Sequence, residues 1–185
     1  MKTIIISFSL LFINSFTTYA GFGPLSLKEK CEKSDIIIHA KVISITRIMP
    51  KDDPISHNPI QLTVSNKGHY YGASSIALVS VIKYIKNKVT KSMGKEIPKF
   101  IMIPCDYAFS ESPSDLTKNR EYIMFLSKMG SNLFHPLDPA STHVVFDKRV
   151  REFGMNHSAI NDPDFKKDSI TYDLFIKKIK KLIKK

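Results

Sequence analysis

Two cysteines are the residues of this chain best suited to covalent chemistry, and they lie far apart, at Cys31 and Cys105. In an exported protein, two such cysteines most often form a structural disulfide. Closing so long a loop would stabilise the fold by roughly 4–5 kcal/mol, through the entropy that the unfolded chain loses. A reactive thiol would need an activating base beside it, and the sequence offers no sign of one. We therefore predict a Cys31–Cys105 disulfide.

Histidine is the commonest metal ligand in proteins, and the chain contains six histidines: His39, His57, His69, His135, His143 and His157. No two of them have the H-x-x-x-H spacing of a helical metal site, and Cys-x-x-Cys is missing. We predict no metal and no cofactor. His57 and His69 flank a long polar stretch and could meet in space, so both are candidate binding residues. His39, within a predicted strand, is expected to be a wall residue with one hydrogen-bonded ring nitrogen.

No arrangement typical of nucleophilic or phosphate chemistry is present. The Gly-x-Ser-x-Gly and P-loop sequences are both missing. Ser34-Asp35 could belong to a hydrolytic triad, but such a pair before a strand more often forms a turn, in which the side chains satisfy free backbone N–H groups. Asp162, Asp164 and Asp168 lack the glycine and the distal glutamate of an EF-hand loop. We predict no catalytic residue.

Aromatic residues with basic neighbours supply further binding candidates. Tyr70 and Tyr71 follow Lys67 and could line a ligand groove. The alternative is that these tyrosines lie at a strand edge, with the rings packed and the hydroxyl groups in water.

The C-terminal segment 168–185 is a predicted amphipathic helix, capped by Asp168-Ser169. Its apolar residues recur at helical spacing: Tyr172, Phe175, Ile176, Ile179, Leu182 and Ile183. Lysines fill the other face, among them the binding candidates Lys177, Lys178 and Lys181. Two interpretations stay open. The stripe packs against the domain core, or the helix docks on a membrane surface or a partner.

The N-terminal segment 1–20 has the layout of a secretory signal peptide. A short basic start precedes a mostly apolar stretch from Thr3 to Phe16, and small residues precede a cleavage site after Ala20. A membrane anchor matches less well, because a span needs ~20 apolar residues. We therefore expect a secreted or periplasmic protein that consists of a single domain, residues 21–185, with no transmembrane segment after cleavage.

Short strand patterns separated by turn residues dominate the mature chain. Apolar β-branched or alternating runs predict strands at 36–45, 75–86, 99–104, 121–127, 132–134 and 142–146, and a short hairpin fits residues 61–64. Residues 25–33 predict a short amphipathic helix or a turn, with Ser26 and Glu29 as a capping box. The predicted fold class is mostly β, a small antiparallel OB-type barrel with a C-terminal amphipathic helix.

The formal net charge is +11, and 43% of the residues are apolar. That apolar content is ordinary for a globular protein and excludes wholesale disorder. The positive charge predicts attraction to anionic surfaces, although it equally suits plain solubility. Because we expect export, we expect a protein partner or an anionic envelope component, with peripheral membrane contact, and no nucleic acid.

Three segments resemble netrin-like domains, which share an OB-type barrel with tissue inhibitors of metalloproteinases and their bacterial relatives. Residues 31–42, Cys-Glu-Lys-Ser-Asp-Ile-Ile-Ile-His-Ala-Lys-Val, are similar to the opening strand of that family. Residues 79–87 resemble its second signature, with Asn87 where glycine is usual, and residues 120–126 resemble a later strand. The resemblance implies the barrel fold.

The resemblance does not imply protease inhibition. In the animal inhibitors, an N-terminal cysteine chelates the zinc of the protease, whereas here the mature chain would begin at Gly21. We therefore predict an exported, non-enzymatic binding module for a protein or an anionic envelope component. The alternatives are a secreted hydrolase with an unrecognised site and a cationic protein that binds membrane surfaces.

Overall fold

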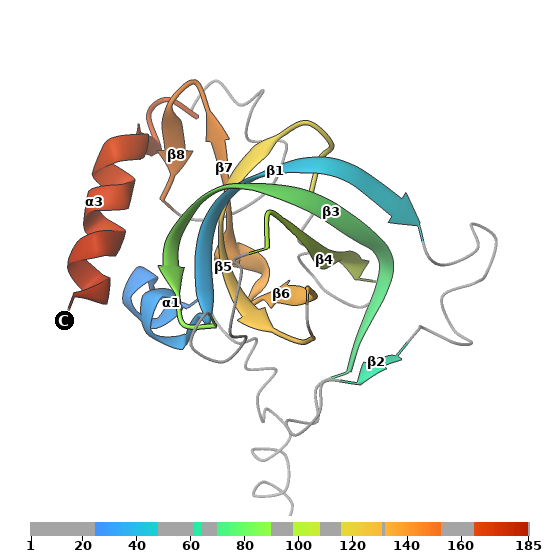
Figure 1. Ribbon diagram of the computed structural model, residues 1–185. Helices are drawn as coiled ribbons and strands as arrows, with labels where there is room; N and C mark the ends of the chain where they lie inside the picture. Colours follow the sequence, from blue (N-terminus) through green and yellow to red (C-terminus); the bar gives the residue numbers. More distant parts are fainter. Residues whose placement is uncertain are drawn as a thin grey trace, which may run out of the picture.

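The computed structural model describes residues 25–47, 61–63, 70–89, 98–107, 116–130, 132–152 and 165–184 (Figure 1). The predicted signal peptide, residues 1–20 with cleavage after Ala20, lies outside the described residues. The candidate binding residues His57 and His69 also lie outside them. For Tyr70 and Tyr71 the backbone is described and the side chains are not.

A single large sheet forms most of the described structure. Its main strand order is β2-β3-β1-β5-β7-β8-β9, with β4 paired to β3 and β6 paired to β5, and all of these ladders are antiparallel. The predicted mostly β architecture with a C-terminal helix is confirmed. The strand ladders do not close this sheet, so the predicted barrel is not confirmed. The strands are β1 (Ile36–Arg47), β2 (Gln61–Thr63), β3 (Tyr70–Asn87), β4 (Phe100–Tyr107), β5 (Glu121–Lys128), β6 (Phe134–Pro136), β7 (Thr142–Phe146), β8 (Arg149–Arg151) and β9 (Ser169–Thr171).

The first helix, α1 (Leu27–Lys33), has the predicted capping box. Ser26 Oγ accepts a hydrogen bond from Glu29 N at 3.3 Å, and the Glu29 carboxylate accepts one from Ser26 N at 2.9 Å. These two bonds satisfy backbone donors that the first helical turn leaves free. A short 3-10 turn, η1 (Pro139–Ser141), leads into β7.

The predicted start of the C-terminal helix is wrong. Ser169 lies in β9, whose backbone pairs with β8, and helix α3 (Tyr172–Ile183) begins after it with Thr171 as N-cap. Asp168 forms an ion pair with Arg151 at 3.6 Å instead of capping the helix. Neither β8 nor β9 is predicted by the sequence pattern.

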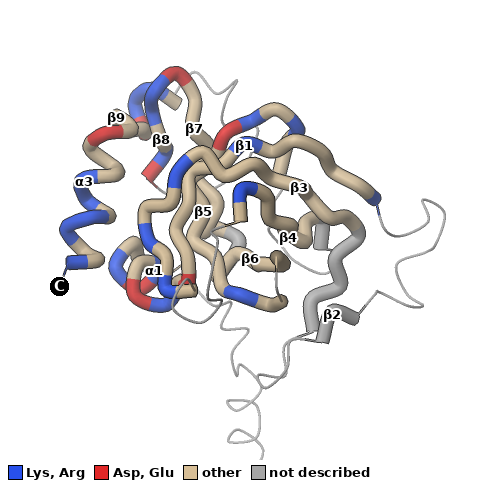
Figure 2. Tube along the Cα trace, in the orientation of Figure 1, with Lys and Arg blue, Asp and Glu red and all other residues tan. Residues whose placement is uncertain are grey.

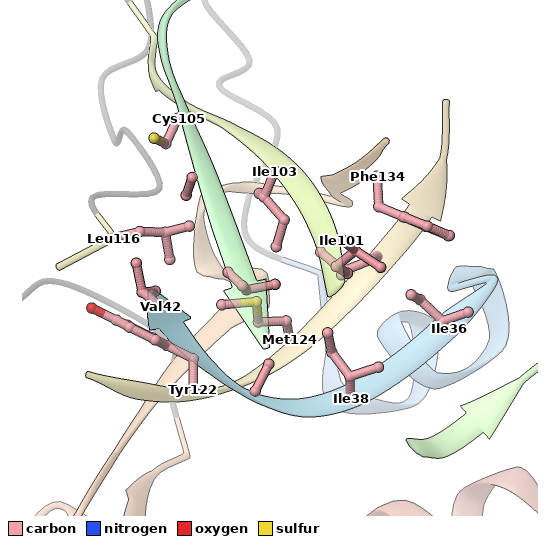
Figure 3. Close-up of a cluster of buried hydrophobic side chains, with 14 of the residues drawn as sticks. Ile36, Ile38, Val42, Ile101, Ile103, Cys105, Leu116, Tyr122, Met124 and Phe134 are labelled. Atoms are coloured by element: carbon pink, nitrogen blue, oxygen red, sulfur yellow. The ribbon is translucent and has the colours of Figure 1, made fainter. Parts of the chain in front are cut away.

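Buried apolar side chains form two clusters on opposite faces of the sheet. Along β1, Ile36 and Ile38 belong to cluster 1, and Ile37 between them belongs to cluster 2. This follows from the alternation of side chains along a strand. Cluster 1 is enclosed by the curled strands and is drawn in Figure 3. Cluster 2 joins the other face of the sheet to α1 and α3.

The apolar stripe of α3 is part of the core. Phe175 and Ile179 are fully buried and Ile176 is 6% exposed, all within cluster 2. Of the two interpretations of this helix, the structure therefore supports packing against the core. The stripe is not free to enter a membrane.

The predicted Cys31–Cys105 disulfide is wrong, because neither cysteine forms a disulfide bond in the structure. Cys31 lies on α1 in cluster 2, whereas Cys105 lies on β4 in cluster 1, where Figure 3 shows it. The sheet separates the two clusters. A disulfide requires Cα atoms within about 7 Å of each other. The prediction failed because the separation of two cysteines along the sequence does not tell which face of a sheet each one occupies.

Candidate binding surface

The middle of β3 and the facing part of β4 carry apolar side chains that point away from cluster 1. Val79 is fully buried in cluster 1, so its neighbours Leu78 and Ser80 face outward. Met102 lies opposite Leu78 in the ladder, and Phe100 lies opposite Ser80. Directly opposed residues share a face, and Met102 and Phe100 are 39% and 52% exposed.

Two isoleucines join this surface at irregularities of the β1–β3 ladder. The register skips Ile82 on β3 and Ile43 on β1, which makes each the extra residue of a β-bulge. Bulges bend a strand and re-aim a side chain. Ile82 is 52% exposed and Ile43 is 38% exposed. We call Ile43, Ile82, Phe100 and Met102 the outer patch.

Helices α1 and α3 cover a different part of the same outer face. They pack over Ile37 of β1 and Phe125 of β5 in cluster 2. Figure 1 shows both helices on one side of the sheet and β4 away from them. Neither of the two α-helices that the structure describes therefore covers the outer patch. Neighbouring exposed apolar residues in a soluble domain typically mark an interaction surface.

Three lysines border the outer patch. Lys41 lies opposite Ser80 in the β1–β3 ladder, and Lys83 and Lys99 adjoin patch residues in the sequence. In the part of the chain that the structure describes, their ammonium groups form no ion pair or hydrogen bond. Figure 2 shows the described trace of β3 and β4 as mostly uncharged, with a positive stretch at one end of β4.

His39 lies beside this surface and ties α3 to the sheet. Its Nε2 lies 3.0 Å from Glu121 Oε2, and its Nδ1 lies 3.1 Å from the Tyr172 hydroxyl oxygen. Both ring nitrogens are bonded, so the prediction of a single bonded nitrogen is wrong. Burial raises the pKa of Tyr172, and the charges of Asp173 and Glu121 raise it further. The phenol therefore stays protonated at neutral pH, and the arrangement is structural.

Of the Ser34-Asp35 pair, only Asp35 satisfies a backbone N–H group as predicted. Asp35 Oδ2 accepts hydrogen bonds from Lys128 N at 2.8 Å and from Ser127 Oγ at 3.1 Å. The Lys86 ammonium donates to Ser34 Oγ at 3.3 Å. Both side chains therefore connect the end of α1 to neighbouring strands rather than form a hydrolytic dyad.

The Lys86 ammonium binds the C-terminal end of α1, where a cation is favoured by the helix dipole. It donates to the carbonyl oxygens of Cys31 and Ser34, the latter at 2.6 Å. Burial, with a smaller contribution from Lys88, lowers the pKa of Lys86 to about 8. Burial also raises the pKa of the Cys31 thiol to about 11, so that thiol is protonated and unreactive at neutral pH.

The three lysine candidates on α3 do not form one common site. Lys178 Nζ lies 2.7 Å from Glu152 Oε1 in an ion pair. Lys177 and Lys181 are exposed, beside the exposed Leu174. Figure 2 shows positive charge along the outside of α3.

None of the outer-patch residues is among the predicted site residues. The pattern of residues 75–86 does contain two apolar faces, one with Leu78 and Ile82 and one with Val79 and Val81. That second apolar face is the signal from which an exposed surface could have been predicted. Periodicity alone does not tell which of two apolar faces meets the core.

Within the described residues, no group of three or more His, Cys, Asp or Glu side chains could hold a metal ion. Among the helices that the structure describes, none is long and apolar enough to cross a membrane. A scan against protein-family models gives no match, and a search of curated proteins finds no similar sequence.

Proposed function

We propose that this chain is an exported, non-enzymatic binding module that holds a protein partner against the outer patch. The observation that carries the proposal is the exposure of Phe100 and Ile82, 52% each, on a part of the sheet that the described helices α1 and α3 do not cover. Apolar side chains at the centre of an interface favour binding because their burial is worth about 25 cal/mol per Å². A protein surface offers apolar groups that match them.

The scaffold that we propose is an OB-type barrel related to netrin-like domains. Antiparallel ladders join β4, β3, β1, β5 and β6 in that order around cluster 1. A single parallel bridge, Met102–Leu133, connects the two ends of this series, with Met102 N donating to Asn132 O at 2.8 Å. These contacts support a five-stranded, partly open barrel. In chain order β3 and β4 are its second and third strands, whose face binds ligands in other OB folds.

A binding role, rather than catalysis, is also supported by the polar side chains that could take part in a reaction, because each of them forms structural contacts. His39 holds α3, Asp35 holds β5, and Lys86 holds the end of α1. Export in this proposal rests on the signal-peptide pattern of residues 1–20, which supports a location in the periplasm or outside the cell.

The test is affinity capture with matched surface variants. The chain from Gly21 is immobilised, envelope and secreted extracts are passed over it, and bound material is eluted with stepped salt. Phe100→Ser and Ile82→Ser each replace one of the two most exposed residues of the outer patch. Leu174→Ser is the control, because Leu174 is similarly exposed, at 45%, but lies on α3.

We expect a discrete protein to stay bound through high salt on the unchanged chain and on Leu174→Ser. The same protein is expected to be lost from Phe100→Ser and Ile82→Ser. Release of all bound material at low salt, or equal capture by every variant, would contradict the proposal.

A further inference from the structure

We propose that the partner of the outer patch is an acidic protein segment, with apolar side chains that cover the patch and carboxylates that meet Lys41, Lys83 and Lys99. This inference rests on the function proposed above and adds the chemistry of the partner. It is carried by the charges at the border of the patch, which are independent of the patch's apolar character.

The register places two of these lysines on the outer face itself. Lys41 is opposite Ser80, and Lys83 is opposite His39. Directly opposed residues of a ladder share a face, and Ser80 is also opposite Phe100. The two ammonium groups therefore border the patch on β1 and on β3. Lys99 adds a third at the start of β4, where it is exposed beside Phe100.

Among the described residues, no carboxylate neutralises these lysines. Glu121 is the cross-strand partner of Lys41 on β5, but its Oε2 lies 3.0 Å from His39 Nε2. The border of the patch is thus cationic, with an apolar centre. This is the arrangement in which burial of the centre supplies affinity, and charges at the rim steer the encounter and select the partner.

A second copy of this chain is a poor occupant of the same surface. In a two-fold symmetric contact, each patch meets itself, so the cationic border would face an identical cationic border. Like charges brought together in this way disfavour the contact. The overall charge of +11 acts in the same direction.

The experiment uses two synthetic peptides of about 12 residues, a length sufficient to lie along a strand pair. Both alternate leucine with a charged residue, which is glutamate in one peptide and lysine in the other. Binding to the purified protein is measured by fluorescence anisotropy at low and high salt. The rim variant carries Lys41→Glu, Lys83→Glu and Lys99→Glu. The control variant carries Lys177→Glu, Lys180→Glu and Lys181→Glu, which change the net charge equally on α3.

We expect the glutamate peptide to bind about tenfold or more tightly than the lysine peptide at low salt. The rim variant is expected to abolish this preference and the α3 variant to keep it. Equal binding of the two peptides, or equal loss in both triple variants, would overturn the inference.

Two further readouts separate this inference from the proposed function. Phe100→Ser is expected to weaken binding of the glutamate peptide. If it has no effect on either peptide, the patch is not a binding surface and the proposed function fails. Sedimentation equilibrium of the unchanged protein is expected to show a monomer. A dimer that Phe100→Ser dissociates would identify a second copy as the occupant and overturn the inference alone.

Discussion

At the scale of single residues, His143 is a histidine buried in the core, 1% exposed. Its ring lies between Phe125 and Phe175, with centroid distances of 5.4 and 5.1 Å. Nδ1 donates to the Arg151 carbonyl oxygen at 3.0 Å, and Nε2 has no partner among the described residues. Burial, together with the nearby Lys30 charge, lowers the pKa of His143 to about 3. The folded protein therefore holds this imidazole neutral.

This burial predicts a loss of stability in mild acid. The folded pKa of about 3 lies below the ordinary value of 6.5, so between these values the unfolded chain binds more protons than the folded one. The free energy of unfolding then falls as the pH falls from 6.5 toward 3, and we expect a loss of about 2 kcal/mol from this residue between pH 7 and pH 5. Urea unfolding of the unchanged protein and of His143→Leu at both pH values measures it. The same pH dependence in both proteins would contradict this assignment.

A buried ion pair gives the second prediction at this scale. The Lys30 ammonium donates to the Ala140 carbonyl oxygen and lies 3.9 Å from Asp138 Oδ1, with side-chain exposures of 4% and 13%. Asp138→Asn removes the counter-charge and leaves Lys30 buried, which we expect to cost about 3 kcal/mol in urea unfolding. The matched control is Glu32→Gln, which breaks the exposed Lys28–Glu32 pair. That change is expected to cost less than about 1 kcal/mol. Equal effects of the two substitutions would show that Asp138 does not compensate Lys30.

At the scale of elements, helix α3 buries its apolar side in cluster 2 and exposes lysines on its other side. Ile179 is fully buried in cluster 2, whereas Lys181 is exposed. We expect Ile179→Ala to lower the free energy of unfolding by 2–5 kcal/mol, through lost burial and a cavity, and Lys181→Ala to change it by less than ~0.5 kcal/mol. Urea unfolding measures both. A folded, equally stable Ile179→Ala variant would mean that the stripe is not core.

Elements with a strong local signal are predictable from this sequence. The capping box of Ser26 and Glu29 and the helical stripe of α3 both follow from fixed spacings. Strands β1, β5 and β7 are predictable because each contains an apolar run of several consecutive or alternating residues. In each case the sequence pattern that indicates the element lies within a few residues along the chain.

Elements that depend on distant partners are not predictable in this way. Strands β8 and β9 have three residues each, too few for a periodic pattern, and they are strands because they pair with each other and with β7. The exposure of the outer patch could not be predicted for the same reason. Ile82 is exposed at a bulge that arises only when β3 pairs with β1. The cationic border likewise depends on Lys41 lying opposite Ser80.

At the scale of the whole molecule, the sheet divides the core into two clusters, and each cluster contains one cysteine. Cys31 packs with the helices in cluster 2, and Cys105 packs inside the curled strands in cluster 1. Residues without shared partners contribute independently to stability. A disulfide would couple them, because removal of either cysteine would break the same bond and release the same constraint on the unfolded chain.

Cys31→Ala, Cys105→Ala and the double variant therefore test the arrangement of the two clusters. We expect each single change to cost roughly 1 kcal/mol, and the double change to cost their sum to within ~0.5 kcal/mol. A double variant no less stable than either single variant, with each single loss at 2–5 kcal/mol, would instead indicate a disulfide. Alkylation without reductant is an independent readout. Because both cysteines are buried and neither forms a disulfide bond, both should react in denaturant and neither in the native protein. If neither reacts in denaturant until reductant is added, the cysteines are paired and the two faces of the sheet are joined there.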